Sequence, residues 1–132
     1  EEITSFIIDN KMDYVKYVGK VSRKEMIALY QNAYLLITAV LYESSSLPIL
    51  EAAASGLPII ASNTPPNIEM GKTLNLNLFK SNNIDRLVSL LVDTWTNIDR
   101  QGQKEFNLDK VKQYSWENIA REYLSEFDKL VR

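Results

Sequence analysis

Short apolar runs alternate with amphipathic stretches along most of this chain. One alternating segment, Tyr14–Val18, and three largely apolar runs at residues 35–41, 57–62 and 76–79 predict four short strands. The last of these runs is the weakest strand signal. Buried parallel strands are joined by helical crossovers, so the pattern predicts an α/β fold. We expect a three-layer α/β/α sandwich with a Rossmann-like parallel sheet of about four strands.

Capping and turn residues set the expected helix boundaries in the first half. Residues 1–12 can form a short helix. Ser22 and Glu25 have the spacing of a capping box before the apolar positions of a second helix. Pro48 suits the first position of a third helix, which is expected to run from Ile49 to about Ser55 and to end at Gly56. The Pro65-Pro66 pair predicts a loop over residues 63–73.

Helical spacing is clearest in the second half of the chain. Apolar residues recur three and four positions apart from Ile84 to Trp95, and a second helix is expected over about 101–113. Ser115 is placed to cap a long amphipathic helix over residues 116–131. Because Trp95 and Trp116 both fall on apolar stripes, we expect both indoles in the core.

Composition excludes several classes of function. The 132 residues suit one domain, residues 1–132, and the net charge of −2 comes without a basic cluster for nucleic acid. The chain has no cysteine or histidine, which excludes disulfides, a His- or Cys-liganded metal and a Ser-His-Asp triad within it. No apolar run is long enough to span a bilayer. These features favour a cytoplasmic protein, with peripheral attachment of the full-length protein at the inner face of the membrane as the alternative.

Two carboxylates around a serine turn are the best candidates for a binding site. Glu43 follows the strand at 35–41, Ser44, Ser45, Ser46 and Leu47 lead into the next helix, and Glu51 lies one turn inside it. The free backbone amides at a helix start suit a phosphate, and a carboxylate can accept hydrogen bonds from both hydroxyls of a ribose diol. We therefore expect both carboxylates to face one crevice. The residues alone also allow a solvated strand end, an ordinary serine turn and a glutamate that only complements the helix dipole.

The segment "YESSSLPILEAAASGLPIIAS" resembles the signature of group 1 (family 4) glycosyltransferases. That signature has two glutamates eight positions apart around a small-residue turn and a Leu-Pro, followed by an alanine-rich helix, a glycine and a proline. Similarity extends to "YVKYVGKVSRKEMIALYQNAYLLI" upstream and to "PPNIEMGKT", "LFKSNNIDRLVSLLVDTW" and "YSWENIAREYLSEF" downstream. The resemblance covers about residues 10–130.

The resemblance implies the donor-binding, C-terminal half of an enzyme with two Rossmann-like domains (GT-B type). Glu43 would contact the donor sugar as the catalytic residue, and Glu51 would hold the ribose hydroxyls. Ser44, Ser45, Ser46 and Leu47 would meet the sugar and diphosphate, and the turn Gly19, Lys20 and Val21 would lie near the base. The implied reaction is sugar transfer from a nucleotide-diphosphate sugar with retention, in polysaccharide or lipopolysaccharide synthesis. It implies no metal and no cofactor besides the donor substrate.

The chain departs from the family pattern at three places. Ser44–Ser46 stand where the family often has Gly-Phe-Gly, and Ala39-Val40 stand where it often has Pro-Ser. The family domain also begins with two further strands, which carry a diphosphate-binding Arg and Lys. We therefore expect Tyr14–Val18 to pair directly with the 35–41 strand, or a partner chain to fill the gap.

Because of these departures, we expect the isolated chain to be inactive without the N-terminal domain of the same enzyme. We also expect that the chain can form a homodimer, either through the exposed sheet edge or through the apolar face of the C-terminal helix. Two alternatives for its function stay open: a non-catalytic nucleotide-binding or assembly module, and an enzyme similar to nucleotide-sugar epimerases.

Overall fold

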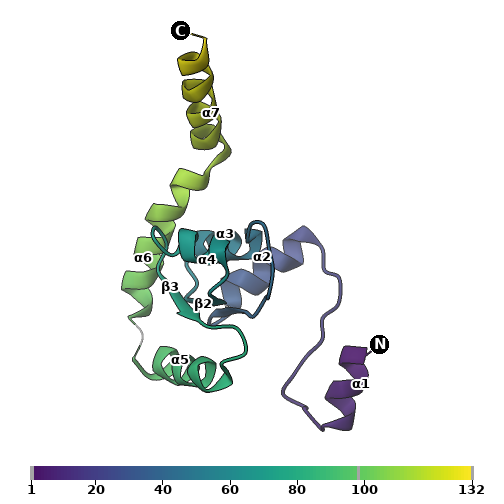
Figure 1. Cartoon of the computed structure of the whole chain (residues 1–132). Helices are drawn as coiled ribbons and strands as arrows, with labels where there is room; N and C mark the ends of the chain where they lie inside the picture. The colour runs from purple at the N-terminus through teal and green to yellow at the C-terminus, as the bar shows by residue number, and fades with distance from the viewer. Residues whose placement is uncertain (1, 98, 132) are drawn as a thin grey trace.

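The computed structural model describes residues 2–97 and 99–131. It contains a small parallel sheet with helices around it and a helical segment at each end that reaches away from the sheet (Figure 1). The strands are β1 (Leu36–Thr38), β2 (Ile59–Ser62) and β3 (Leu76–Phe79). The helices are α1 (Glu2–Asp9), α2 (Arg23–Asn32), α3 (Leu47–Ala54), α4 (Pro65–Met70), α5 (Ile84–Asn97), α6 (Arg100–Lys110), the 3₁₀ turn η1 (Val111–Tyr114) and α7 (Trp116–Leu130).

The core forms on the two faces of β2, the central strand. The sheet order is β1-β2-β3, both pairings are parallel, and all four residues of β2 are buried. Ile59 and Ala61 pack with α3 on one face, whereas Ile60 packs with Phe79 of β3 and Leu90 of α5 on the other. Because successive strand residues point to opposite faces, one buried strand holds helices on both sides. The predicted α/β/α sandwich is confirmed.

The predicted fourth strand is wrong. Tyr14–Val18 has no strand structure, so the sheet of the described residues has three strands and β1 pairs only with β2. The side chains of Tyr14, Tyr17 and Val18 are 82%, 61% and 58% exposed. An alternating pattern forms a strand only where a neighbouring strand accepts its hydrogen bonds, and no described segment does so here. The direct pairing expected with the 35–41 segment is therefore also wrong.

The remaining strands and the first caps match the sequence closely. β3 has the predicted bounds, β2 lies within the predicted run, and β1 is shorter than the apolar run at 35–41. Ser22 caps α2: its hydroxyl accepts from the amide of Glu25 at 3.3 Å, and its own amide donates to the Glu25 carboxylate at 2.8 Å. Interaction of the Glu25 carboxylate with the Ser22 side chain and with the Ser22 backbone amide lowers the pKa of Glu25. The predicted capping box is confirmed.

Helix α3 ends as the sequence predicts and begins one residue earlier. Leu47 is its first residue, so Pro48 lies second rather than first, where its missing N–H still costs no helical hydrogen bond. Gly56 follows the helix with φ +71°, the left-handed conformation that glycine adopts without strain. Ile49 and two alanines of α3 are fully buried against the sheet.

The loop predicted at Pro65-Pro66 is wrong, because these prolines open helix α4. They occupy its first positions after the N-cap Thr64, where backbone amides have no partner within a helix. Asn67 holds the helix to the sheet, since its fully buried amide donates to the Ser62 carbonyl at 2.9 Å. Proline therefore starts this helix instead of preventing it.

The last three helical segments confirm the predicted stripes but not the burial of the tryptophans. Trp95 of α5 is 67% exposed, with its ring stacked on Tyr34 at 4.5 Å between centroids, and Trp116 of α7 is 83% exposed. Helix α5 buries Leu90 against the sheet, but its last turn extends past that contact. No residue of α7 is buried within the described chain, and the helix points away from the sheet (Figure 1). An apolar stripe becomes core only where another element covers it.

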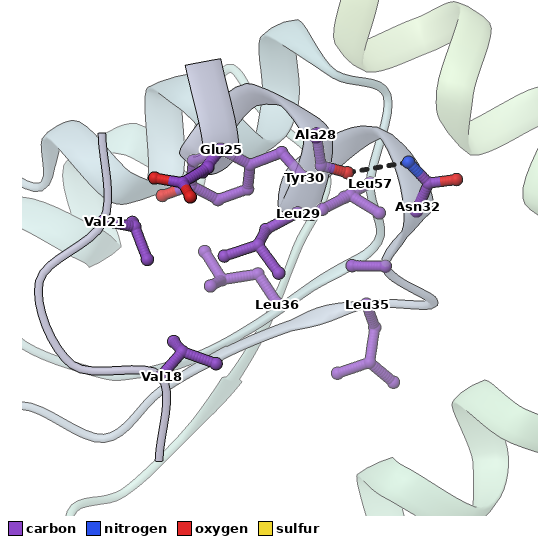
Figure 2. Close-up of a pocket in the computed structure, with 11 residues that line it drawn as sticks. Val18, Val21, Glu25, Ala28, Leu29, Tyr30, Asn32, Leu35, Leu36 and Leu57 are labelled. Carbon is purple, nitrogen blue, oxygen red and sulfur yellow. Dashed lines mark hydrogen bonds between the residues drawn. The ribbon is translucent and has the colours of Figure 1, made fainter. Parts of the chain in front are cut away.

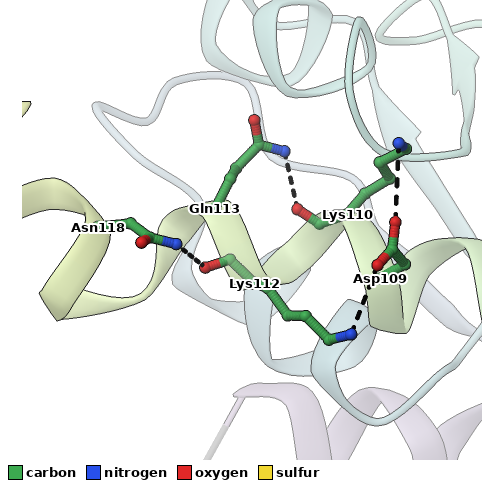
Figure 3. Close-up of polar contacts among 5 residues, drawn as sticks. All are labelled: Asp109, Lys110, Lys112, Gln113 and Asn118. Carbon is green, nitrogen blue, oxygen red and sulfur yellow. Dashed lines mark hydrogen bonds and ion pairs between the residues drawn. The ribbon is translucent and has the colours of Figure 1, made fainter.

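A polar junction joins α6 to α7. The Lys112 carbonyl accepts from the Asn118 amide at 2.8 Å, and Gln113 donates to the Lys110 carbonyl at 2.7 Å (Figure 3). Asp109 pairs with both flanking lysines on the exposed side. The Lys112 carbonyl also accepts from the Ser115 amide at 3.0 Å, so backbone and side chain together fix the turn between the two helices. No helix within residues 2–97 and 99–131 has the length and apolar character needed to cross a membrane.

Candidate functional site

The loops that leave β1 and β2 are hydrogen-bonded to each other. Ser62, at the end of β2, donates its hydroxyl hydrogen to the Val40 carbonyl at 2.6 Å. Two residues further on, buried Thr64 donates to the carboxylate of Glu43 at 3.3 Å. Parallel strands bring their carboxyl ends to one edge of a sheet, where ligands bind in folds of this type. Glu43 is therefore held at the edge at which a ligand is expected.

A groove lies beside Glu43. It has a volume of about 680 Å³ and lies between the loop after β1 and the start of α4. Its wall consists of Leu41, Tyr42, Glu43, Ser44, Thr64, Pro65 and Pro66. Tyr42 is 93% exposed, so its ring stands at the rim. The groove places one carboxylate against a mostly apolar wall, a surface suited to contact with a sugar ring.

The serine turn presents backbone more than side chains. Ser44 and Ser45 are exposed, whereas Ser46, the N-cap of α3, is 1% exposed and its hydroxyl has no partner among the described residues. The Ser46 carbonyl accepts from the amides of Ile49 and Leu50, which starts the helix. Within the described chain, the amides of Ser45, Ser46 and Leu47 donate to no other group. Ser45 and Leu47 are exposed whereas Ser46 is buried, and unpaired amides at the positive end of a helix suit an anion.

Glu51 lies on α3 and contacts a different helix from the one that Glu43 contacts. Its carboxylate is exposed and accepts a hydrogen bond of 3.1 Å from the hydroxyl of Tyr30 in α2. Burial of the Tyr30 ring, together with this bond and the charge of Glu51, raises the pKa of Tyr30 to about 12. The phenol is therefore a permanent donor to Glu51 at any physiological pH.

The turn at residues 19–21 lies beside α2. Gly19 has φ +61°, Lys20 is exposed, and Val21 is half-buried. Val21 lines an apolar cavity of about 790 Å³ together with Tyr30 and residues of α2, β1 and the chain before β2 (Figure 2). Tyr30 thus belongs both to this cavity and to the contact with Glu51.

The structure brings some of the expected residues together and leaves others separate. Glu43 and the serine turn share one loop, and Val21 lines the same cavity as Tyr30, which bonds to Glu51. Glu43 contacts the start of α4, whereas Glu51 contacts α2. That both carboxylates face one crevice stays a prediction.

Tyr30 and Thr64 were not singled out from the sequence, although each donates to one of the two carboxylates. Tyr30 falls on the apolar stripe of its helix, where its ring is expected in the core. The only sequence signal for a polar contact is that a buried tyrosine hydroxyl usually needs a hydrogen-bond partner. Thr64 lies in the segment predicted as a loop, and although it is the N-cap of α4 its hydroxyl makes no capping bond and donates to Glu43 instead, which no local pattern indicates.

Comparison with known proteins adds evidence of family. The family model described as "Glycosyl transferases group 1" matches residues 9–103, which include the serine turn and both carboxylates. The O-antigen chain mannosyltransferase B of Escherichia coli is 30% identical over 119 residues, which cover 86% of this chain and 30% of that protein. The MMP alpha-(1->4)-mannosyltransferase of Mycolicibacterium hassiacum is 28% identical over 124 residues, covering 90% and 30% respectively.

The chain thus spans about 30% of the length of these curated relatives. The family match begins in the last residue of α1, includes all three strands and ends within α6. The elements that form the sheet, the serine turn and the contacts of both carboxylates therefore all lie inside it. On this evidence, the chain belongs to the group 1 glycosyltransferases.

Proposed function

We propose that this chain forms the donor-binding part of a retaining glycosyltransferase that uses a nucleotide-diphosphate sugar. One observation carries the proposal: the exposed carboxylate of Glu51 lies one turn inside α3, whose first amides have no partner in the described chain. A carboxylate next to free amides matches a ligand that carries both a diol and a phosphate.

Each part of the site has one proposed role. Glu51 accepts hydrogen bonds from the ribose hydroxyls, and the amides of Ser45, Ser46 and Leu47 bind the diphosphate. Ser44 and Glu43, which share the groove after β1, contact the donor sugar. The turn at residues 19–21 lies toward the base. The named relatives are both mannosyltransferases, which favours a hexose such as mannose as the transferred sugar and polysaccharide synthesis as the setting.

Catalysis by Glu43 would depend on its hydrogen bond to Thr64. In a retaining transfer, positive charge develops at the anomeric carbon while the diphosphate leaves. A carboxylate held in one orientation can stabilise that charge or orient the sugar, and the positive end of α3 can stabilise the leaving diphosphate. A transferase also needs an acceptor site. We propose that this site lies in the part of the enzyme that corresponds to the remaining length of the relatives, and expect no turnover from this chain alone.

Amide NMR titration with UDP, GDP and ADP sugars tests the proposal. We expect shifts to cluster at residues 43–51 and 19–21, and Glu51→Ala to weaken binding by about 1–3 kcal/mol, or about fivefold to 150-fold. Glu126→Ala is the matched control, because Glu126 is an exposed helical glutamate of α7 that pairs only with a lysine on its own helix. Shifts clustered away from the serine turn, or equal effects of the two substitutions, would refute the proposed donor site.

The same titration separates the two alternatives that the sequence leaves open. An assembly module would show no nucleotide-sugar shifts at the serine turn, whereas a non-catalytic nucleotide-binding module would show them but would give no sugar transfer in the full-length protein. An enzyme similar to epimerases would convert the sugar of the bound nucleotide without an acceptor. The sugar's NMR signals would then change while the mass of the nucleotide sugar stays the same.

A further inference from the structure

The hydroxyl of Tyr30 joins two helices at the proposed ribose contact. Tyr30 lies in the last turn of α2 and Glu51 in the middle of α3, and their side chains meet at 3.1 Å. The Tyr30 ring packs against the core cluster that includes Ile49, Ala52 and Ala53 of α3. Its position is therefore fixed by the same packing that fixes the helix carrying Glu51.

The hydrogen bond restricts an otherwise free side chain. Glu51 is exposed, and a glutamate on a helix surface normally samples several rotamers, which a ligand must then restrict at an entropic cost. Tyr30 donates to one carboxylate oxygen, Oε2. Each carboxylate oxygen can accept two hydrogen bonds, so Oε1 and one site on Oε2 remain for a ligand. Near neutral pH the phenol is protonated and donates, and burial together with this bond raises its pKa further, to about 12.

We propose that Tyr30 is a positioning residue: it orients the carboxylate of Glu51 so that its remaining acceptor sites face the hydroxyls of a ribose diol. This inference rests on the proposed function and adds a determinant of its specificity. By holding Glu51 in place before the ligand arrives, Tyr30 makes binding depend on the diol itself. The chain should then prefer ribonucleotides over deoxyribonucleotides, and Tyr30 should account for part of that preference.

The test compares UDP, GDP and ADP with their 2′-deoxy forms on the full chain, using the nucleotide that binds most tightly. In the unmodified chain we expect the ribonucleotide to bind about tenfold more tightly than its 2′-deoxy form. Tyr30→Phe should reduce this ratio to about twofold by weakening the ribonucleotide alone. A purely structural role would weaken both ligands equally and leave the ratio unchanged, which would overturn the inference.

Two further variants complete the experiment. Tyr34→Phe is the control, because it removes a hydroxyl that contacts the Trp95 carbonyl and not Glu51. It should leave the ratio at about tenfold. In a Glu51→Ala background, which removes the acceptor of the Tyr30 hydroxyl, Tyr30→Phe should change the ratio no further, since the two residues act through one contact. An additional loss in that background would also overturn the inference.

The possible failures can be distinguished. If the unmodified chain shows no preference for the ribonucleotide, the ribose contact of the proposed function is wrong and the inference fails with it. If the preference exists and survives Tyr30→Phe, only the inference fails. If Tyr30→Phe does not fold, a second measurement replaces it. The pKa of the Tyr30 phenol is measured by ¹³C NMR in Glu51→Gln and in the unmodified chain. The pKa should fall below that of the unmodified chain, and an unchanged pKa would exclude the contact in solution.

Discussion

Asn107 of α6 is expected to stabilise the fold more than its single side chain suggests. The residue is fully buried, and its amide group bonds to the backbone of two other segments. Its oxygen accepts from the Asn75 amide, just before β3, at 3.0 Å, and its nitrogen donates to the Leu57 carbonyl, between α3 and β2, at 3.4 Å. Asn107 thus links α6 to the segment that leads into β2 and to the segment that leads into β3.

The magnitude follows from what Asn107→Ala leaves behind. Each buried backbone group that loses its partner costs about 1–3 kcal/mol. The bond to Leu57 is long, and Asn75 is exposed enough for water to replace its partner, so both costs fall in the lower part of that range. With a small cavity added, we expect a loss of about 2–3 kcal/mol in the free energy of unfolding, or a fall of roughly 10 °C in Tm for a chain of this size.

Urea unfolding followed by circular dichroism measures this loss. The matched control is Asn32→Ala, because Asn32 also donates from its amide to a carbonyl, that of Ala28 at 2.8 Å, but on an exposed surface (Figure 2). Water replaces that bond, so the control should lose less than about 0.5 kcal/mol. If Asn107→Ala loses no more than Asn32→Ala, the buried amide does not carry the stabilisation assigned to it here.

Two further predictions concern the backbone and pH. Gly56→Ala should lower the free energy of unfolding by about 2 kcal/mol, because φ is +71° and the new Cβ would meet the side chain of Lys104 in α6. Gly19→Ala is the control: φ is +61° but the surroundings are open, so urea unfolding should show only the backbone strain of about 1 kcal/mol. Equal costs would show that the α6 contact adjusts freely. The pKa of Tyr30 is raised from 10.0 to about 12, so its stabilising contribution is complete below pH 10 and is lost as the pH rises toward 12. Because solvent screens the partly exposed ring, we expect the unmodified chain to lose about 1 kcal/mol more than Tyr30→Phe over that interval, and equal losses would contradict the shift.

Helices could be predicted from the sequence because their signals are local. The capping box of Ser22 and Glu25, the Ser115 cap and the stripe over Ile84–Trp95 each specify a helix within a few residues. The error at Pro65-Pro66 came from treating proline as a helix breaker in every position. At the first turn proline removes only donors that no helix can satisfy.

Burial was harder to predict, because a stripe shows which side of a helix is apolar but not what covers it. Leu90 of α5 is buried since β2 and β3 lie against it, whereas Trp95, five residues further on, contacts the ring of Tyr34 and is 67% exposed. The contacts of the site carboxylates have the same origin. Glu43 and Glu51 were found from their spacing, but Thr64 and Tyr30, each 21 residues away in sequence, meet them only through the fold.

The strand that failed shows the same limit most clearly. The segment Tyr14–Val18 consists of strand-favouring Tyr and Val around one lysine, and the chain still leaves Tyr14, Tyr17 and Val18 exposed. A parallel strand gains its hydrogen bonds only from a neighbour that is distant in sequence, so its local pattern is necessary but not sufficient. β2 satisfies both conditions, because β1 and β3 pair with it on either side and helices cover both of its faces. The proposed donor site lies at the ends of the strands that do pair, so the contacts of Glu43 and Glu51 do not depend on the predicted strand that failed.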